Sequence, residues 1–145
     1  MKKQLLFAHI FTLLFGGIIY IIFRKDTLLM FNWFDSLSIQ PLIEYIRSIQ
    51  LIQNIKLPSW FIFSLPGGLW IFSYITIMLF IWKNKVTQEN LFWFLIIPII
   101  ALFSEIGQLL QVLPGTFDFI DLVFYLFGFI IPFKFSNILL IPKTN

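Results

Sequence analysis

Three acidic side chains and two glutamines lie between residues 105 and 121 of a chain that is otherwise strongly apolar. On either side of a Pro114-Gly115 turn, these residues are Glu105, Gln108, Gln111, Asp118 and Asp121. A carboxylate near the centre of a bilayer costs about 2.5–3.5 kcal/mol on insertion scales. Neighbouring helices, water or a ligand must therefore compensate these charges.

Carboxylates that converge on one place support several kinds of chemistry. Their oxygens would bind a divalent cation such as Mg²⁺ or Ca²⁺, which makes Glu105, Asp118 and Asp121 the candidate metal ligands. Two carboxylates in unlike surroundings would serve as a general acid and a general base. They would also pair with a cation, such as an amine on a ligand. Structural roles stay open beside these: Asp118 would cap a helix, and Glu105 would hydrogen-bond between helices.

Helical spacing brings these side chains onto facing surfaces. At about 100° per residue, the residues before the turn share a broad arc, while Asp118, Asp121 and Tyr125 form one stripe after it. A short turn makes the two helices antiparallel neighbours. The candidate residues of a polar cleft are therefore Glu105, Gln108, Gln111, Asp118, Asp121 and Tyr125. No catalytic residue is assigned, because the single histidine, His9, lies far from the carboxylates in sequence.

Composition defines the class of protein that must position these residues. Of 145 residues, 59% are hydrophobic and only 12% are charged, which is about half the usual charged share of a soluble domain. An integral membrane protein is therefore expected. The absence of cysteine excludes disulfides and thiolate metal sites. The net charge of +3 comes with no dense basic run, so nucleic-acid binding is not expected.

Apolar runs predict an all-α membrane protein with a single domain over residues 1–145. The four transmembrane helices are expected at about 5–23, 64–82, 91–113 and 117–133. Ser64 is expected to cap the second, and Ser73 to point into the bundle. His9 is expected to be hydrogen-bonded near a helix end rather than catalytic.

The connection over about 27–56 is expected to hold an amphipathic helix on the membrane surface. Pro41 suits the first turn of a helix, because its φ is fixed. One face of that helix would be apolar. The residues of this face are Leu42, Tyr45, Ile46, Ile49 and Ile52.

The distribution of lysine and arginine predicts the orientation. One side of the membrane would hold six of them, Lys2, Lys3, Lys83, Lys85, Lys134 and Lys143. The other would hold four, Arg24, Lys25, Arg47 and Lys56. Positive residues favour the inner side, so both termini are expected in the cytoplasm and the Pro114-Gly115 turn outside.

The stretch around the turn resembles the VanZ-like family of small bacterial membrane proteins. The family pattern is a Glu followed one turn later by a Gln, a Pro/Gly loop, two Asp residues and then a Gly. Here it is matched by Glu105, Gln108, Pro114-Gly115, Asp118, Asp121 and Gly128. The usual loop Arg is replaced by Pro114-Gly115-Thr116, and the usual Asn by Tyr125. We expect Arg24 or Arg47 to supply the missing positive charge.

The resemblance implies a role in the cell envelope, in a family associated with resistance to the glycopeptide antibiotic teicoplanin. The first functional hypothesis is an outward-facing acidic cleft that binds a lipid-linked or amine-bearing envelope ligand, with or without a divalent cation. The second is an intramembrane enzyme that acts on a lipid or lipid-phosphate through these carboxylates. The third is a non-catalytic assembly subunit in which the polar groups join helices.

Overall fold

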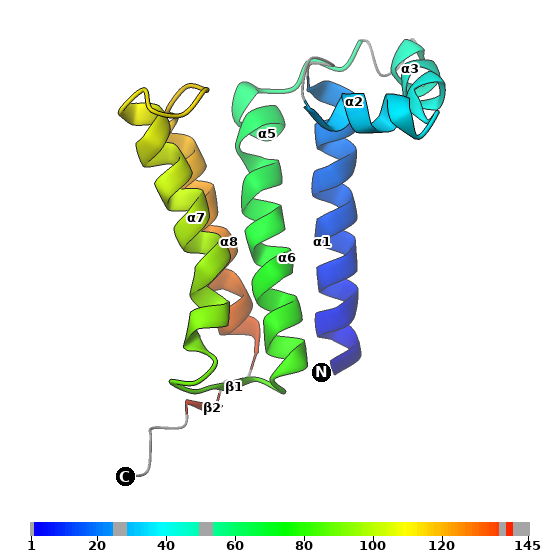
Figure 1. Ribbon diagram of the computed structural model, residues 1–145. Coiled ribbons are helices and arrows are strands. Elements are labelled where there is room, and N and C mark those ends of the chain that lie inside the picture. Colours follow the sequence, from blue (N-terminus) through cyan, green and yellow to red (C-terminus); the bar gives the residue numbers. More distant parts are fainter. Residues whose placement is uncertain (1, 25–28, 50–53, 137–138, 141–145) are drawn as a thin grey trace.

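The computed structural model describes residues 2–24, 29–49, 54–136 and 139–140, which form a bundle of long helices with short helices at one end (Figure 1). The helices are α1 (Lys2–Phe23), α2 (Leu29–Ser36), α3 (Gln40–Ser48), α5 (Ser59–Phe63), α6 (Leu65–Ile81), α7 (Leu91–Leu109) and α8 (Phe119–Phe135). The strands β1 (Lys85–Val86) and β2 (Leu139–Leu140) pair in parallel, a small departure from the all-α prediction.

Three of the four expected spans are long and apolar enough to cross a membrane: Lys3–Phe23, Ser59–Ile81 and Leu91–Leu109. The fourth helix, α8, lies where it was predicted. It has 17 residues and so reaches about 26 Å, somewhat less than a typical hydrocarbon core of about 30 Å. Large apolar side chains face outward, with Phe7 70%, Phe103 64% and Phe119 67% exposed, as expected for surfaces that contact lipid.

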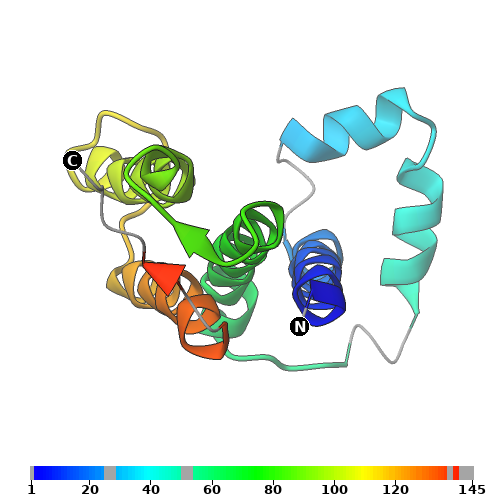
Figure 2. The ribbon, with the colours of Figure 1, turned by 90° about the horizontal axis from the view of Figure 1, so that it is seen from below.

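Helix α6 is the centre of the bundle (Figure 2). It packs along α1 on one side and along α8 on the other, while α7 lies beside α8. The core is formed by Ile71, Ile75 and Leu79 of α6 with Phe94 of α7. Helices α1 and α7 are not packed along one another in the described part of the chain.

Glycines set the spacing between α6 and α8. A Cβ added at Gly128 would overlap the backbone oxygen of Gly68, and one added at Gly68 would lie 2.8 Å from the Phe124 oxygen. Without a hydrophobic driving force between helices in lipid, close backbone contact through small residues is a main source of association.

Two helix ends differ from the prediction. The second span begins at Ser59, after Pro58, rather than at 64, and the Ser64 side chain makes no capping hydrogen bond. Helix α7 ends at Leu109 instead of 113, because Gln111 has φ +58°. The N–H of Val112 then donates to the Gly107 oxygen at 2.9 Å, a bond that closes the helix end.

A helix is present in the predicted connection as α3, with Pro41 in its first turn. Leu42 and Tyr45 of its expected apolar face are 59% and 69% exposed, and its place on the membrane surface stays a prediction. The side packed on the bundle is different: Ile43 is buried, and Arg47 donates to the carbonyl oxygens of Ile21 and Arg24 at the end of α1. Ile52 lies outside the described residues.

The contact between α1 and α6 includes a polar pair. Ser73 is buried, as predicted, and its Oγ lies 2.7 Å from His9 Nδ1. The same hydroxyl donates to the His9 backbone oxygen at 3.1 Å. His9 is therefore hydrogen-bonded between helices, in keeping with the structural interpretation of this residue.

Candidate functional site

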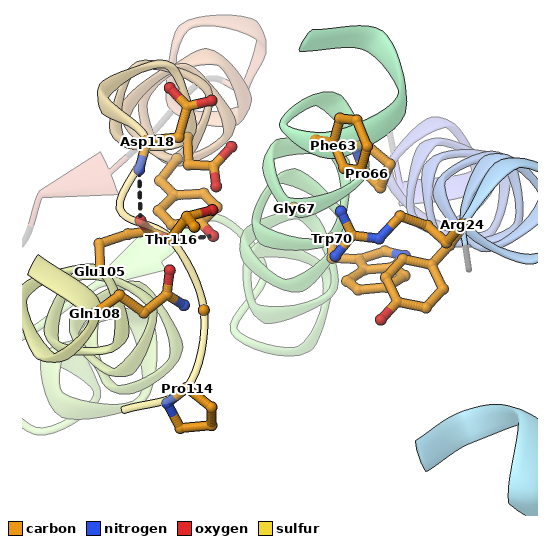
Figure 3. A pocket seen from close by; sticks show the side chains of 14 residues that line it. Arg24, Phe63, Pro66, Gly67, Trp70, Glu105, Gln108, Pro114, Thr116 and Asp118 are labelled. Carbon is orange, nitrogen blue, oxygen red and sulfur yellow. Dashed lines mark hydrogen bonds between the residues drawn. The ribbon is translucent and has the colours of Figure 1, made fainter. Parts of the chain in front are cut away.

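A cavity of about 650 Å³ lies at the end of the bundle where α1 ends, α6 begins and α7 turns into α8 (Figure 3). This volume is within the range of pockets that hold small molecules, about 300–1,000 Å³. The lining residues are Tyr20, Arg24, Phe63, Pro66, Gly67, Trp70, Glu105, Gln108, Pro114, Gly115, Thr116, Asp118, Asp121 and Tyr125.

Glu105 connects α7 to α8. Its side chain is only 3% exposed, and its Oε2 accepts a hydrogen bond from the Asp118 backbone N–H at 3.4 Å. Its Oε1 accepts one from the Tyr125 hydroxyl at 3.2 Å. Each oxygen therefore has one donor from the other helix. The hydrogen bond from Tyr125 joins two residues that are 20 apart in sequence, as helical spacing on the two sides of the turn predicted.

Asp118 caps α8. Its backbone is extended, with φ −130°, and its carboxylate accepts a hydrogen bond from the Ile120 N–H at 2.9 Å. This is the capping role that the sequence suggested, at the helix end where the dipole favours a negative charge. One oxygen of Asp118 is thus used for structure.

Asp121 has a different environment from the other two carboxylates. Its Oδ1 is buried and has no hydrogen-bond partner among the described residues, and the same is true of the Ser64 hydroxyl. The Ser64 hydroxyl and the Glu105 carboxyl are its nearest polar neighbours, and Asp118 and Arg24 are its charged neighbours. A buried polar atom without a partner is rare and costly, and the Ser64 hydroxyl is the nearest internal donor for this carboxylate.

Gln108 is held against the loop. A Cβ at Gly115 would lie 2.8 Å from the Gln108 Cδ, and Gly115 has φ +133°, a conformation that side-chain-bearing residues rarely adopt. The Pro114-Gly115 turn therefore packs its backbone directly on the Gln108 amide, which keeps the loop over the cavity.

Arg24 forms part of the opposite wall. Its guanidinium carbon lies 5.1 Å from the centre of the Tyr20 ring and 4.9 Å from that of Phe63. Figure 3 shows it across the cavity from Glu105 and Asp118. Of the two arginines expected to supply positive charge, Arg24 lines the cavity, whereas Arg47 binds backbone oxygens at the end of α1.

The cavity brings together five of the six predicted residues and leaves out Gln111. That side chain is exposed, because α7 ends two residues before it and the helical angle no longer applies. The aromatic wall of Tyr20, Phe63 and Trp70 was not predicted. Tyr20 and Arg24 are four apart on one helix, which is the spacing that could have indicated it.

The candidate metal ligands do not form a recognisable metal group. Within residues 2–24, 29–49, 54–136 and 139–140, no set of three or more His, Asp or Glu side chains is arranged to hold a metal ion. Glu105 and Asp118 direct oxygens at backbone N–H groups. The described geometry therefore gives the divalent cation no support.

No protein-family model, curated protein or solved structure matches this chain.

Proposed function

We propose that this chain is a VanZ-like membrane protein of the bacterial cell envelope whose cavity binds a lipid-linked or amine-bearing ligand. One observation carries the proposal: the acidic residues before and after the Pro114-Gly115 turn line a single cavity, together with Gln108 and Tyr125. The same cavity is also lined by one arginine, Arg24, and by four aromatic side chains, Tyr20, Phe63, Trp70 and Tyr125.

The departures from the family pattern have physical substitutes in this chain. Tyr125, in the place of the usual Asn, donates to Glu105. Arg24 brings to the cavity the positive charge that the loop lacks. Gly128 lies at the closest approach of α6 and α8, where any Cβ would overlap backbone atoms. Each motif position thus has a reason to hold the residue it holds.

Acidic side chains outnumber basic ones in the cavity lining, which favours a cationic group on the ligand. Three acidic side chains and one guanidinium line the cavity, and an ammonium group gains charge-assisted hydrogen bonds from a carboxylate that a neutral alcohol does not. Asp121, whose carboxyl group lines the cavity, is the first anchor we propose for such an amine.

Amine binding is the direct test. Ethanolamine, titrated into purified protein and followed by NMR, is expected to bind the wild type and to bind Glu105→Gln and Asp121→Asn at least tenfold more weakly. The matched control is Asp35→Asn, an exposed acid on α2. Equal ethanolamine binding by all four proteins would contradict the proposal and leave the non-catalytic assembly role.

The proposal also includes four membrane crossings, α8 being the fourth, with the cavity end outside and both termini in the cytoplasm. Because the chain has no cysteine, a single introduced thiol is the only one to react. Thr116→Cys in the cavity loop is expected to react with a membrane-impermeant maleimide in whole cells, and Lys85→Cys at the other end is not. The reverse pattern would invert the orientation.

A second candidate function is an intramembrane enzyme acting on a lipid or lipid-phosphate. It is favoured by the unlike surroundings of Glu105, with two donors, and Asp121, with an unpartnered oxygen, since acid and base roles need such a difference. Mass spectrometry of lipids incubated with the protein would detect a product that is lost in Asp121→Asn. If the lipids are unchanged, the enzyme function is contradicted and only the binding function remains.

A further inference from the structure

The two sides of the cavity carry opposite charges. The acidic side is formed by α7 and α8, with Glu105, Asp118 and Asp121. The basic side is Arg24, at the end of α1, and Figure 3 shows its guanidinium directed into the space across from the acids. A ligand that carries a cation and an anion in one small group would complement both sides.

Neighbouring residues hold Arg24 in this position. The rings of Tyr20 and Phe63 contact its guanidinium, so the side chain is supported by cation–π contacts inside the cavity. The backbone oxygens at the end of α1 are already bound by Arg47, which donates to Ile21 and Arg24. The Arg24 guanidinium is therefore not needed to close its own helix.

The cavity lies among helices suited to a membrane. Its lining residues come from α1, α6 and α7, each part of a segment long and apolar enough to cross a bilayer, and from α8. A headgroup bound at this polar end would keep its acyl chains beside the apolar surfaces of these helices.

We infer that the cavity receives a phosphoethanolamine-type headgroup, with its ammonium group at Asp121 and Glu105 and its phosphate at Arg24. The amine half of this inference rests on the proposed function. The phosphate half is new, and it makes Arg24 a selectivity residue. A guanidinium pairs with phosphate through two parallel N–H···O bonds, which gives geometric as well as electrostatic selectivity.

The same chemistry occurs in a membrane lipid and in a soluble molecule. Phosphatidylethanolamine and glycerophosphoethanolamine share the headgroup, and only the first gains from acyl chains held in the bilayer. The apolar spans that surround the cavity favour the lipid.

Native mass spectrometry and thermal-shift measurements of purified protein would test the inference with four probes: phosphatidylethanolamine, phosphatidylglycerol, glycerophosphoethanolamine and ethanolamine. For the wild type we expect phosphatidylethanolamine to bind at least about tenfold more tightly than either phosphatidylglycerol or ethanolamine, since each lacks one charged partner. If glycerophosphoethanolamine binds more weakly than phosphatidylethanolamine but more tightly than ethanolamine, the lipid is the preferred source. Equal binding of the two headgroup forms identifies the soluble one.

The variants separate the two halves of the site. Arg24→Gln is expected to reduce phosphatidylethanolamine binding about tenfold without weakening ethanolamine binding, because ethanolamine has no anion for the guanidinium to bind. Arg24→Lys should recover part of the loss, and Lys56→Gln, an exposed cation outside the cavity, should match the wild type. Asp121→Asn should weaken both amine probes.

Each outcome bears on a different claim. If ethanolamine binds and depends on Asp121, but Arg24→Gln leaves the lipid preference intact, the phosphate site is overturned and the proposed function stands. If no amine probe binds, both fall. If Arg24→Gln does not fold, the wild-type ranking decides: phosphatidylglycerol bound as well as phosphatidylethanolamine would overturn the inference.

Discussion

The contact between α6 and α8 and the cavity beside α7 are built in opposite ways. Between α6 and α8, Gly68 and Gly128 bring two backbones into direct contact with no room for a methyl group. Beside α7, polar side chains and aromatic rings surround about 650 Å³. Close packing of backbones therefore stabilises the α6–α8 contact, whereas polar and aromatic side chains line the cavity beside α7.

This comparison also explains how the acidic end is tolerated. The close glycine contact at Gly68 and Gly128 fixes α6 against α8 and involves no charged side chain. We call these two helices the frame, and the carboxylates therefore need only join α7 to α8 and line the cavity. Glu105 spans from α7 to α8, and Asp118 closes the end of α8. The frame and the site therefore respond differently to mutation.

The largest expected effect breaks the frame. Gly128→Ala would place a Cβ over the Gly68 carbonyl oxygen, and both neighbours are backbone, so the helices must separate. We expect a loss of about 3 kcal/mol or more in thermal unfolding, at the upper end of overpacking costs. Gly17→Ala is the control, because nothing lies within 4 Å of its added Cβ. Similar stabilities of the two variants would contradict the close contact.

A smaller effect is expected where α3 contacts the end of α1. Arg47→Gln removes charged donors from the Ile21 and Arg24 carbonyl oxygens. A loss of about 1–2 kcal/mol follows from hydrogen bonds of this kind in a partly exposed setting. Chemical unfolding, compared with Lys56→Gln, would measure it. An unchanged midpoint would mean that α3 is not fixed to α1 by this residue.

The cap of α8 is expected to contribute about 1 kcal/mol. Asp118→Ala removes the acceptor for the Ile120 N–H, and Asp118→Asn retains one. Thermal unfolding should therefore rank the wild type above the asparagine variant and the alanine variant last. A ranking in which alanine equals the wild type would leave Asp118 to serve only the cavity.

The smallest effect is expected at the contact of α1 with α6. Ser73→Ala removes the hydroxyl that bonds His9, and such bonds between membrane helices average about 0.6 kcal/mol. Thermal unfolding should fall by about that amount, with no change in ethanolamine binding. A binding defect in this variant would show that the cavity depends on the remote contact.

Much of this organisation could be read from the sequence because it follows from periodicity and composition. Apolar runs located α1, α6, α7 and α8, and helical spacing brought Glu105 to Tyr125 across the short turn. Asp118 matched the residue type that caps helices. Pro41 marked the start of α3.

Other features depend on conformations that the pattern does not specify. Gln111 looks helical in the sequence, but its positive φ ends α7 early and removes it from the cavity. Ser64 looks like a cap, but Pro58 starts the span earlier and leaves the Ser64 hydroxyl buried near Asp121. The place of Arg24 depends on tertiary packing between α1 and α6, which one helix alone does not show.

The central claim is that acidic and phenolic groups from α7 and α8 form one site. A double-mutant cycle on unfolding free energy, with Glu105→Ala and Tyr125→Phe, tests it most directly. We expect a coupling of about 1 kcal/mol or more between these two, and additivity for Glu105→Ala with the remote Ser73→Ala. Additivity within about 0.3 kcal/mol for the Glu105–Tyr125 pair would contradict the account.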